Sequence, residues 1–188
     1  MDEQNSFERG DGSDSGRWDG ELARARAALE PVKASLAAAG FYAYGMIDEQ
    51  HRWTIAADSE EGRVDVRVGA DGLNVSLWTS SPGLYADEEN DFRRRALERL
   101  ARMTLPNIVR GFLAPHQSAV WDETDQGIAV TISYDLPFVR AGDVGELVRD
   151  KLVELEELLT FVESRVSTYR EPRASVCLAA MLALGEEC

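Results

Sequence analysis

The stretch from residue 128 to residue 169 constrains the fold more than any other part of this chain. It opens with apolar side chains at every second position and then changes to apolar spacings of three and four after a glycine-containing loop. Side chains alternate along a strand and repeat every 3.6 residues along a helix. We therefore expect a half-buried strand over residues 128–136, ended by Pro137, that leads into a long helix over residues 143–169.

The apolar stripe of this long helix fits either a coiled-coil seam or a helix face that lies on a sheet. The stripe steps by four and three through Val148, Leu152, Leu155, Leu159, Val162 and Val166. Leu147, Leu158 and Phe161 widen it, which favours packing on a sheet. Asp143, with Glu146 three positions later, is the expected N-cap of this helix.

The first half of the chain predicts one helix and an antiparallel meander. The helix spans residues 19–39, with Asp19 as its N-cap, Gly40 as its C-terminal signal and Pro31 as the point where it kinks or splits. Alternating apolar residues and short polar turns then predict three strands, at residues 53–57, 64–68 and 73–78.

The middle of the chain predicts a second helix and a hairpin. Asp87 is the expected cap of this helix, whose apolar residues recur to Met103, and Pro106 is expected to end or bend it. A short strand at residues 118–121 and a turn at residues 122–127 precede the strand at 128–136. The Asp/Glu-rich turn lacks the ligand pattern of a calcium loop, which favours a plain hairpin.

Together these elements predict an α+β fold with a single antiparallel sheet, formed by a three-stranded meander and a hairpin and packed by helices. The expected order is α-β-β-β-α-β-β-α, followed by an extra apolar C-terminal helix. We divide the chain into an acidic, disordered tail at residues 1–17, the α+β domain at 18–170 and a helical extension at 171–188. Within that extension the apolar segment 174–184 is expected to be buried in the chain or in a dimer.

The charge balance excludes two classes of partner. The chain has 188 residues and a net charge of -14. Binding to nucleic acid without sequence preference needs clustered Lys and Arg side chains, and so does binding to anionic membrane surfaces. We therefore expect no nucleic acid and no membrane as partner. The N-terminal residues lack a signal-peptide pattern and two cysteines suggest no disulfide framework, which predicts a cytoplasmic protein.

No pattern of residues points to a reaction centre. His51 and His116 have no second ligand type at metal spacing, and the chain has neither a GxSxG elbow nor a glycine-rich phosphate loop. Cys177 is expected to be a small core residue and Cys188 to be exposed. The sequence therefore assigns no catalytic residue, no metal ligand and no cofactor, and predicts that the chain is not an enzyme.

Three tryptophans on predicted strands are the candidate partner-binding residues: Trp78, Trp121 and Trp53. Trp78 is one position out of phase with Leu73, Val75 and Leu77, so it should point to the opposite face of the sheet. An exposed tryptophan there would be a candidate anchor for a partner. The alternative is that the first helix or the terminal helix covers it.

The order of elements resembles the fold of type III secretion chaperones and, within it, the YbjN-like bacterial proteins. The matching stretches run from Leu22 to Gly40, from Trp53 to Trp78 and from Asp87 to Leu113, followed by "ITISYDLP" and "VGELVRDKLVELEELLTFVE". The resemblance covers roughly residues 20 to 166. Departures are the Pro106-containing extension of the middle helix and the apolar tail after Pro172.

The resemblance implies a noncatalytic protein-binding module. YbjN-like proteins are described as sensory or stress regulators, and the secretion chaperones bind unfolded client segments and often dimerise. We therefore expect a chaperone-like or regulatory bacterial protein whose partner is a protein client or a second copy in a homodimer. Two alternatives stay open: a small-molecule-binding or carboxylate-dependent enzyme, which needs a polar pocket with convergent Asp or Glu, and a structural accessory subunit of a larger assembly.

Overall fold

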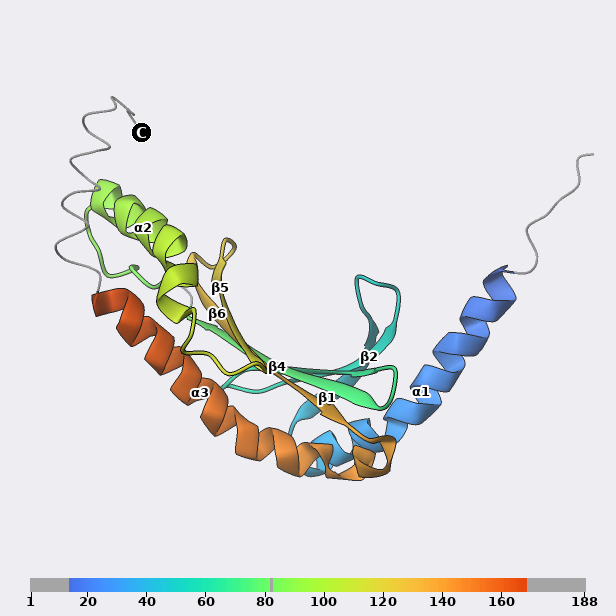
Figure 1. Cartoon of the computed structure of the whole chain (residues 1–188). Helices are drawn as coiled ribbons and strands as arrows, with labels where there is room; N and C mark the ends of the chain where they lie inside the picture. Colours follow the sequence, from blue (N-terminus) through green and yellow to red (C-terminus); the bar gives the residue numbers. More distant parts are fainter. Residues whose placement is uncertain (1–13, 82, 169–188) are drawn as a thin grey trace, which may run out of the picture.

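The structure is a computed structural model that describes residues 14–81 and 83–168. Six strands form one sheet and three α-helices pack around it (Figure 1). In chain order the elements are α1 (Asp14–Ala38), β1 (Tyr42–Ile47), β2 (Trp53–Asp58), β3 (Arg63–Val68), β4 (Leu73–Ser81), α2 (Asp91–Val109), β5 (Gln117–Asp122), β6 (Gly127–Leu136), a 3₁₀ turn (Phe138–Asp143) and α3 (Val144–Thr168).

The sheet is antiparallel throughout, with strand order β1-β2-β3-β4-β6-β5. The expected α+β class and single antiparallel sheet are therefore confirmed. The meander has four strands and not three, because Tyr42–Ile47 pairs with β2 along its whole length. The chain then leaves the sheet through α2 and returns as a hairpin whose second strand, β6, pairs with β4.

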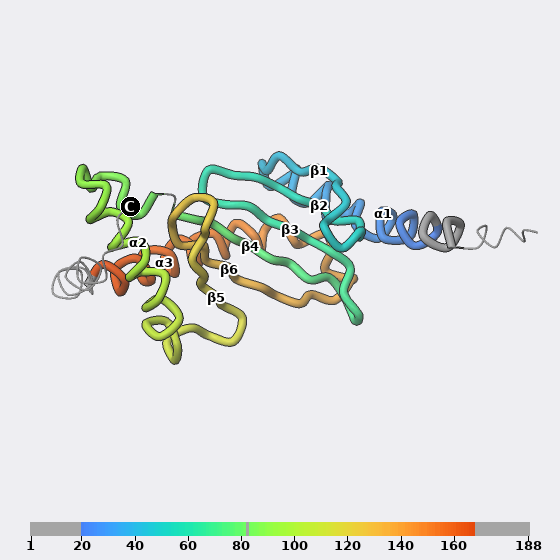
Figure 2. The backbone as a smooth tube through the Cα atoms, turned by 90° about the horizontal axis from the view of Figure 1, so that it is seen from above, coloured from blue at the N-terminus to red at the C-terminus, as the bar shows by residue number. Residues whose placement is uncertain are grey.

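Strict alternation gives the sheet one apolar face. The side chains of the four central strands that point to this face are almost fully buried; they include Ile55, Val64, Val66, Leu73, Val75, Leu77, Ile128, Val130 and Ile132. Helices α1 and α3 run beneath this face, and α2 packs against β5 and α3 at one end (Figures 1 and 2). The core thus lies between the sheet and the helices.

Helix α3 lies on the sheet, as the width of its stripe predicts. Val148, Leu155, Val162 and Val166 are buried in the common core, and α3 contacts both β4 and β6. Its first turn is held by α1, because Ser35 Oγ accepts a hydrogen bond from the Gly145 amide at 2.9 Å and donates one to the Gly142 carbonyl at 2.6 Å.

Two predicted helix starts are wrong, whereas α3 begins at Val144, directly after Asp143, as expected. Helix α1 begins at Asp14, so Asp19 and the last residues of the expected tail, 14–17, lie inside it. Pro31 also lies inside the helix, which is not split there. Asn90 caps α2 in place of Asp87, since its side chain accepts from the Arg93 amide at 3.0 Å. Asp143 pairs with Arg140 at 3.1 Å, and the Ser35 contact takes the place of the expected cap.

Pro106 lies inside α2, which continues to Val109. The segment 174–184 and residues 1–13 lie outside the described residues. Within the described part of the chain, no helix is both long enough and apolar enough to cross a membrane.

Candidate functional site

No helix of the described residues lies over the second face of the sheet, here called the open face (Figure 2). The strand register arranges its side chains in rows that cross the strands. One row consists of Met46, Thr54, Arg67, Asn74 and Asp135; the next of Tyr44, Ala56, Asp65, Ser76 and Ser133; the third of Tyr42, Asp58, Arg63, Trp78 and Thr131. Small side chains in the middle row lie between larger ones on either side.

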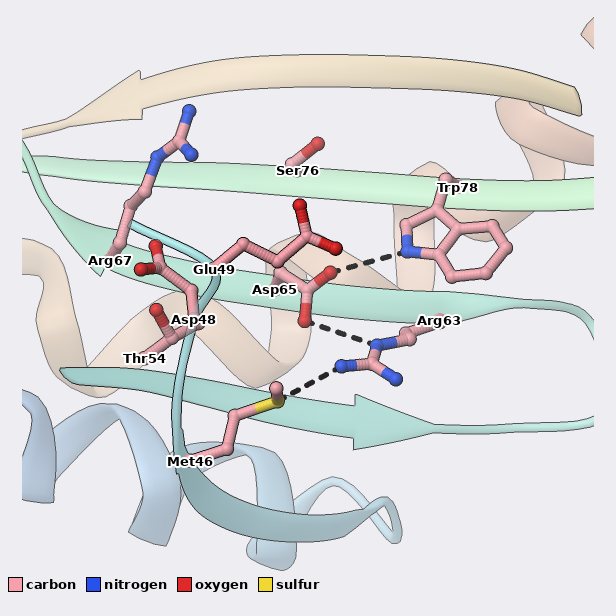
Figure 3. A pocket seen from close by; sticks show the side chains of 9 residues that line it. All are labelled: Met46, Asp48, Glu49, Thr54, Arg63, Asp65, Arg67, Ser76 and Trp78. Carbon is pink, nitrogen blue, oxygen red and sulfur yellow. Dashed lines mark hydrogen bonds and ion pairs between the residues drawn. The ribbon is translucent and has the colours of Figure 1, made fainter. Parts of the chain in front are cut away.

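Trp78 is held in place on this face by Asp65. Its indole Nε1 donates to Asp65 Oδ2 at 3.2 Å, and Arg63 Nε donates to the other oxygen at 3.1 Å (Figure 3). Arg63 also lies 3.0 Å from the Met46 sulfur. Although partial burial would lower it, the pKa of Arg63 is raised, chiefly by the charge of Asp65. The indole ring is therefore fixed before any partner arrives.

Arg67 is held by a second polar chain. Its Nε donates to Asn74 Oδ1 at 3.1 Å, and Asn74 Nδ2 donates to Asp135 Oδ1 at 3.1 Å. Within residues 14–81 and 83–168, no carboxylate lies within ion-pair distance of Arg67. The contact at Nε orients the guanidinium plane and leaves the two terminal nitrogens without a hydrogen-bond partner among the described residues.

A pocket of about 290 Å³ lies between these two anchored side chains. Figure 3 shows the side chains that line it, which come from β1, the turn after it, β2, β3 and β4: Met46, Asp48, Glu49, Thr54, Arg63, Asp65, Arg67, Ser76 and Trp78. Most of the lining residues are thus polar or charged, and Trp78 forms one aromatic wall.

Thr54 is the exception to good polar pairing in this pocket. The residue is 4% exposed, and its buried Oγ1 atom has no hydrogen-bond partner in residues 14–81 and 83–168. Leaving a buried hydroxyl unsatisfied costs about 1–3 kcal/mol. Glu49, on the rim, also makes no ion pair with any described residue. In this pocket the buried Thr54 hydroxyl, the terminal nitrogens of Arg67 and the Glu49 carboxylate therefore have no hydrogen-bond or ion-pair partner among the described residues.

The turn that carries Glu49 is fixed by Asp48. Its Oδ1 accepts from the backbone amides of Gln50 and Arg52, each at 2.9 Å, and its Oδ2 pairs with the Arg52 side chain at 2.8 Å. Partial burial alone would raise the pKa of Asp48, but these hydrogen bonds outweigh it and lower the pKa. Asp48 is therefore used by the turn and carries no uncompensated charge.

Two tyrosines extend the open face towards the β1 edge. The Tyr44 hydroxyl donates to Asp58 at 2.9 Å, and this hydrogen bond raises the pKa of Tyr44. The Tyr42 ring lies 5.7 Å from the Tyr44 ring and is largely exposed. Aromatic side chains therefore stand at two places on the face, at the β1 edge and at Trp78.

The three predicted partner-binding tryptophans do not form one surface. Trp78 lies on the open face, half-buried, and α1 packs on the opposite side of the sheet. Trp53 and Trp121 pack against the core on that opposite side, with Arg26 lying 5.2 Å above the Trp53 ring. Only Trp78 has the geometry expected of an anchor for a partner on the open face.

Thr54 and Arg67 were missed by sequence reasoning. The alternation of β3 predicts that Arg63, Asp65 and Arg67 share the solvent-facing side of the strand. It does not predict which of the two arginines forms an ion pair with a carboxylate. That depends on the register of β2, β3 and β4, which places Thr54 beside Arg67 and Arg67 beside Asn74.

A second polar cluster joins α3 to the β5–β6 hairpin on the helix side of the sheet. Its centre is Glu154, which accepts from His116 at 3.0 Å, Gln117 at 3.1 Å, Tyr134 at 2.9 Å and Lys151 at 2.7 Å. The Lys151 contact is the largest cause that lowers the pKa of Glu154 to about 2.

The ionisation of this cluster does not resemble that of an acid–base pair. The pKa of Tyr134 is raised by burial and the pKa of Lys151 is raised by its bond to Glu154. The pKa of each of these groups, like that of Glu154, is moved further from pH 7. A general acid or base works best with a pKa near the operating pH. Among the described residues no group of three or more His, Cys, Asp or Glu could hold a metal ion.

Comparison of the chain with protein-family models, with curated proteins and with solved structures found no match.

Proposed function

We propose that this chain is a noncatalytic protein-binding module of the cytoplasm, chaperone-like or regulatory, that binds an extended segment of a client polypeptide on its open face. One observation carries the proposal: no helix of the described residues covers a sheet face that presents an anchored tryptophan beside a row of small side chains. Aromatic side chains that are fixed before binding are typical anchors of protein interfaces.

The chemistry of the face supports a polypeptide as partner. Hydrogen-bonding side chains such as Ser76, Ser133 and Asn74 alternate with Trp78 and the tyrosines, and such a mixture suits a peptide's amides and apolar side chains. The net charge of -14 favours basic clients. The resemblance in element order to the secretion chaperones and YbjN-like proteins points the same way, with one strand more in this chain.

The second candidate is a small-molecule-binding domain. It is favoured by the pocket of about 290 Å³, close to the lower end of ordinary ligand pockets, in which Asp48, Glu49 and Asp65 converge. Asp48 and Asp65 are already paired with Arg52 and Arg63, which leaves Glu49 as the one acid of the three without an ion pair among described residues. This reduces the case for a carboxylate-dependent reaction.

The proposal is tested with a variant that fills the open face. Ser133→Trp places a large ring in the row of small side chains, and Val153→Trp makes the same change at an exposed position on α3. Binding to an array of short peptides is measured by fluorescence for both variants and for the wild type. We expect peptide binding by the wild type, a loss of about tenfold or more in Ser133→Trp and no change in Val153→Trp.

Absence of peptide binding by the wild type, or equal binding by both variants, would contradict the proposal. Self-association is a separate part of it: we expect a homodimer, checked by light scattering of the full chain. If the chain is a monomer, the homodimer part of the proposal is wrong, but the proposal of peptide binding on the open face is unaffected. Binding only within a larger complex, with no peptide bound by the isolated chain, would favour a structural accessory subunit.

A further inference from the structure

We infer that the pocket between Arg67 and Trp78 recognises the free C-terminal carboxylate of a bound polypeptide. In this assignment Arg67 and Thr54 bind the carboxylate, and Trp78 packs against an apolar side chain about four residues from the chain end. The inference rests on the proposed function, since it names the part of the client that the open face selects.

The carboxylate end of the pocket is built from Arg67 and Thr54, whose donors are not all used by the described residues. Among these residues Arg67 donates through Nε, to Asn74, and the buried Thr54 hydroxyl has no partner, although Thr54 is the register neighbour of Arg67 on the next strand. A guanidinium fork binds a carboxylate through two parallel hydrogen bonds, and a hydroxyl can donate a third. A carboxylate is therefore the group that suits donors of both kinds, and binding it at both side chains requires the buried Thr54 hydroxyl to turn towards the ligand.

The guanidinium group of Arg67 is oriented before any ligand binds. Asn74 accepts from Arg67 at 3.1 Å and is itself tied to Asp135 at 3.1 Å, so the guanidinium plane is fixed by two strands, β4 and β6. Lysine would be a poor replacement for Arg67 here, because the three N–H donors of an ammonium do not form the planar fork with which a guanidinium matches both oxygens of a carboxylate while its Nε stays bonded to Asn74. The fixed fork favours a planar carboxylate.

The distance to Trp78 sets the length of the recognised segment. Trp78 is the register partner of Arg63, which lies four residues before Arg67 on β3. At about 3.3 Å per residue the two anchors lie roughly 13 Å apart, the length of about four extended peptide residues. Ser76, the residue of β4 between them, is small and leaves room for a peptide backbone.

Glu49 determines which charge is favoured on the peptide residues next to the terminal carboxylate. It lies on the rim of the pocket and has no ion pair with a described residue. Its charge opposes a second acid near the chain end and favours a basic or neutral residue there. Removal of this charge, in Glu49→Gln, should strengthen binding of the terminal carboxylate by a few-fold at low salt.

The test compares two probes that differ only at the C-terminus. These are the N-acetylated tetrapeptide Phe-Ala-Ala-Ala with a free carboxylate and the same peptide as its amide, titrated into the full chain by calorimetry. We expect the wild type to bind the acid about ten- to a hundredfold more tightly than the amide, as expected for a charge-assisted pair. Arg67→Gln and Arg67→Lys should remove most of this preference, and Thr54→Val should reduce it about fivefold.

Two further variants separate this inference from the proposed function. Trp78→Ala should weaken the acid and the amide peptide alike, because it removes the anchor shared by both. Arg102→Gln removes the same charge from an exposed position paired with Glu123 and should leave both affinities unchanged. Equal binding of acid and amide by the wild type would overturn the C-terminal assignment while the peptide-binding proposal stands. An acid preference that survives Arg67→Gln would also overturn it.

Discussion

Single side chains decide what the open face can bind, and Thr54 is the clearest case. Thr54 lies on β2, between β1 and β3, where backbone groups already pair with one another, and among the described residues neither strand neighbour gives its hydroxyl a partner. A strand position of this kind is usually filled by valine, which has the same shape without the polar atom. Threonine at this position lowers the stability of the ligand-free chain, and a role of its hydroxyl in binding would account for its presence.

The first prediction concerns the stability of Thr54→Val. Replacing an unsatisfied buried hydroxyl by a methyl group of similar volume should raise the free energy of unfolding by about 1 kcal/mol. Urea denaturation of the ligand-free chain measures it. Thr131→Val, at a half-buried position of the same face, is the matched control and should change stability by less. A loss of stability in Thr54→Val would mean that the hydroxyl is satisfied in solution.

The second prediction concerns Glu154 and pH. The pKa of Glu154 falls from 4.5 to about 2 in the folded chain, mainly through Lys151. Because the folded pKa is depressed, the stabilisation is complete above about pH 4.5 and is lost as the pH falls towards 2. Allowing for partial exposure of the cluster, we expect Glu154→Gln to lower the free energy of unfolding at pH 7 by about 1–2 kcal/mol.

Denaturation at neutral pH and at successively lower pH checks this prediction. The difference between wild type and Glu154→Gln should shrink through the window from 4.5 to about 2. Glu157→Gln, at an exposed position of the same helix, should not differ from the wild type by more than about 0.5 kcal/mol. A difference that stays constant with pH would show that the effect is one of packing and not of charge.

At the scale of elements, the joint between α1 and α3 holds the layer of helices together. Gly145 allows α3 to approach α1 closely, since a Cβ at this position would clash with the Ser35 carbonyl and lie 2.8 Å from the Ala39 Cβ. The Ser35 hydroxyl then replaces a local cap for α3. The sheet's apolar face depends on this joint, because both helices cover it.

The third prediction follows from this close approach. Gly145→Ala should lower the free energy of unfolding by about 1–3 kcal/mol, because backbone of one helix must move to make room. Gly142→Ala, three residues earlier and with nothing within 4 Å of the added Cβ, is the matched control. Thermal unfolding of both variants checks it, and equal melting temperatures would contradict the observed contact.

Most of the elements could be predicted from the sequence, and the misses have physical reasons. The strands at residues 53–57, 64–68, 73–78, 118–121 and 128–136 are confirmed because apolar and polar residues alternate there. β1 was missed because its residues, Tyr-Ala-Tyr-Gly-Met-Ile, do not alternate between apolar and polar. Gly45 is nevertheless required, since a Cβ there would meet the Trp53 ring.

The caps were predicted less well than the helices, because a cap is a contact and not a pattern. Ser35 lies 110 positions from Gly145 in sequence, so no local motif can reveal that it replaces Asp143. The candidate site also depends on contacts between residues that are far apart in the sequence. The phase of Trp78 could be read from β4 alone, whereas the meeting of Thr54 with Arg67 needs the register of two hairpins.

At the scale of the whole molecule, the dominant quantity is the net charge of -14. Like charges repel in the compact state, and salt screens that repulsion over about 8–10 Å at physiological ionic strength. The ion pairs of the surface, such as Arg102 with Glu123, are worth little individually and weaken with salt. The net effect of added salt should therefore be stabilising.

The fourth prediction is that the melting temperature of the full chain rises by a few degrees between low and moderate sodium chloride. Calorimetry at constant pH measures it, and sodium perchlorate at the same ionic strength distinguishes screening from a specific ion effect. A fall in melting temperature would mean that the surface ion pairs outweigh the repulsion between excess acids.

The pairing of β4 with β6 has a consequence for how the molecule forms. The other ladders join strands that are neighbours in sequence, whereas Asn74 and Asp135 are separated by 61 positions. Closing so long a loop costs entropy before any contact compensates for it, so this ladder should form late. The Arg67–Asn74–Asp135 chain crosses that junction. A correctly aimed Arg67 therefore exists only after the last long-range step of folding, and partially folded copies of the chain should be unable to engage a partner there.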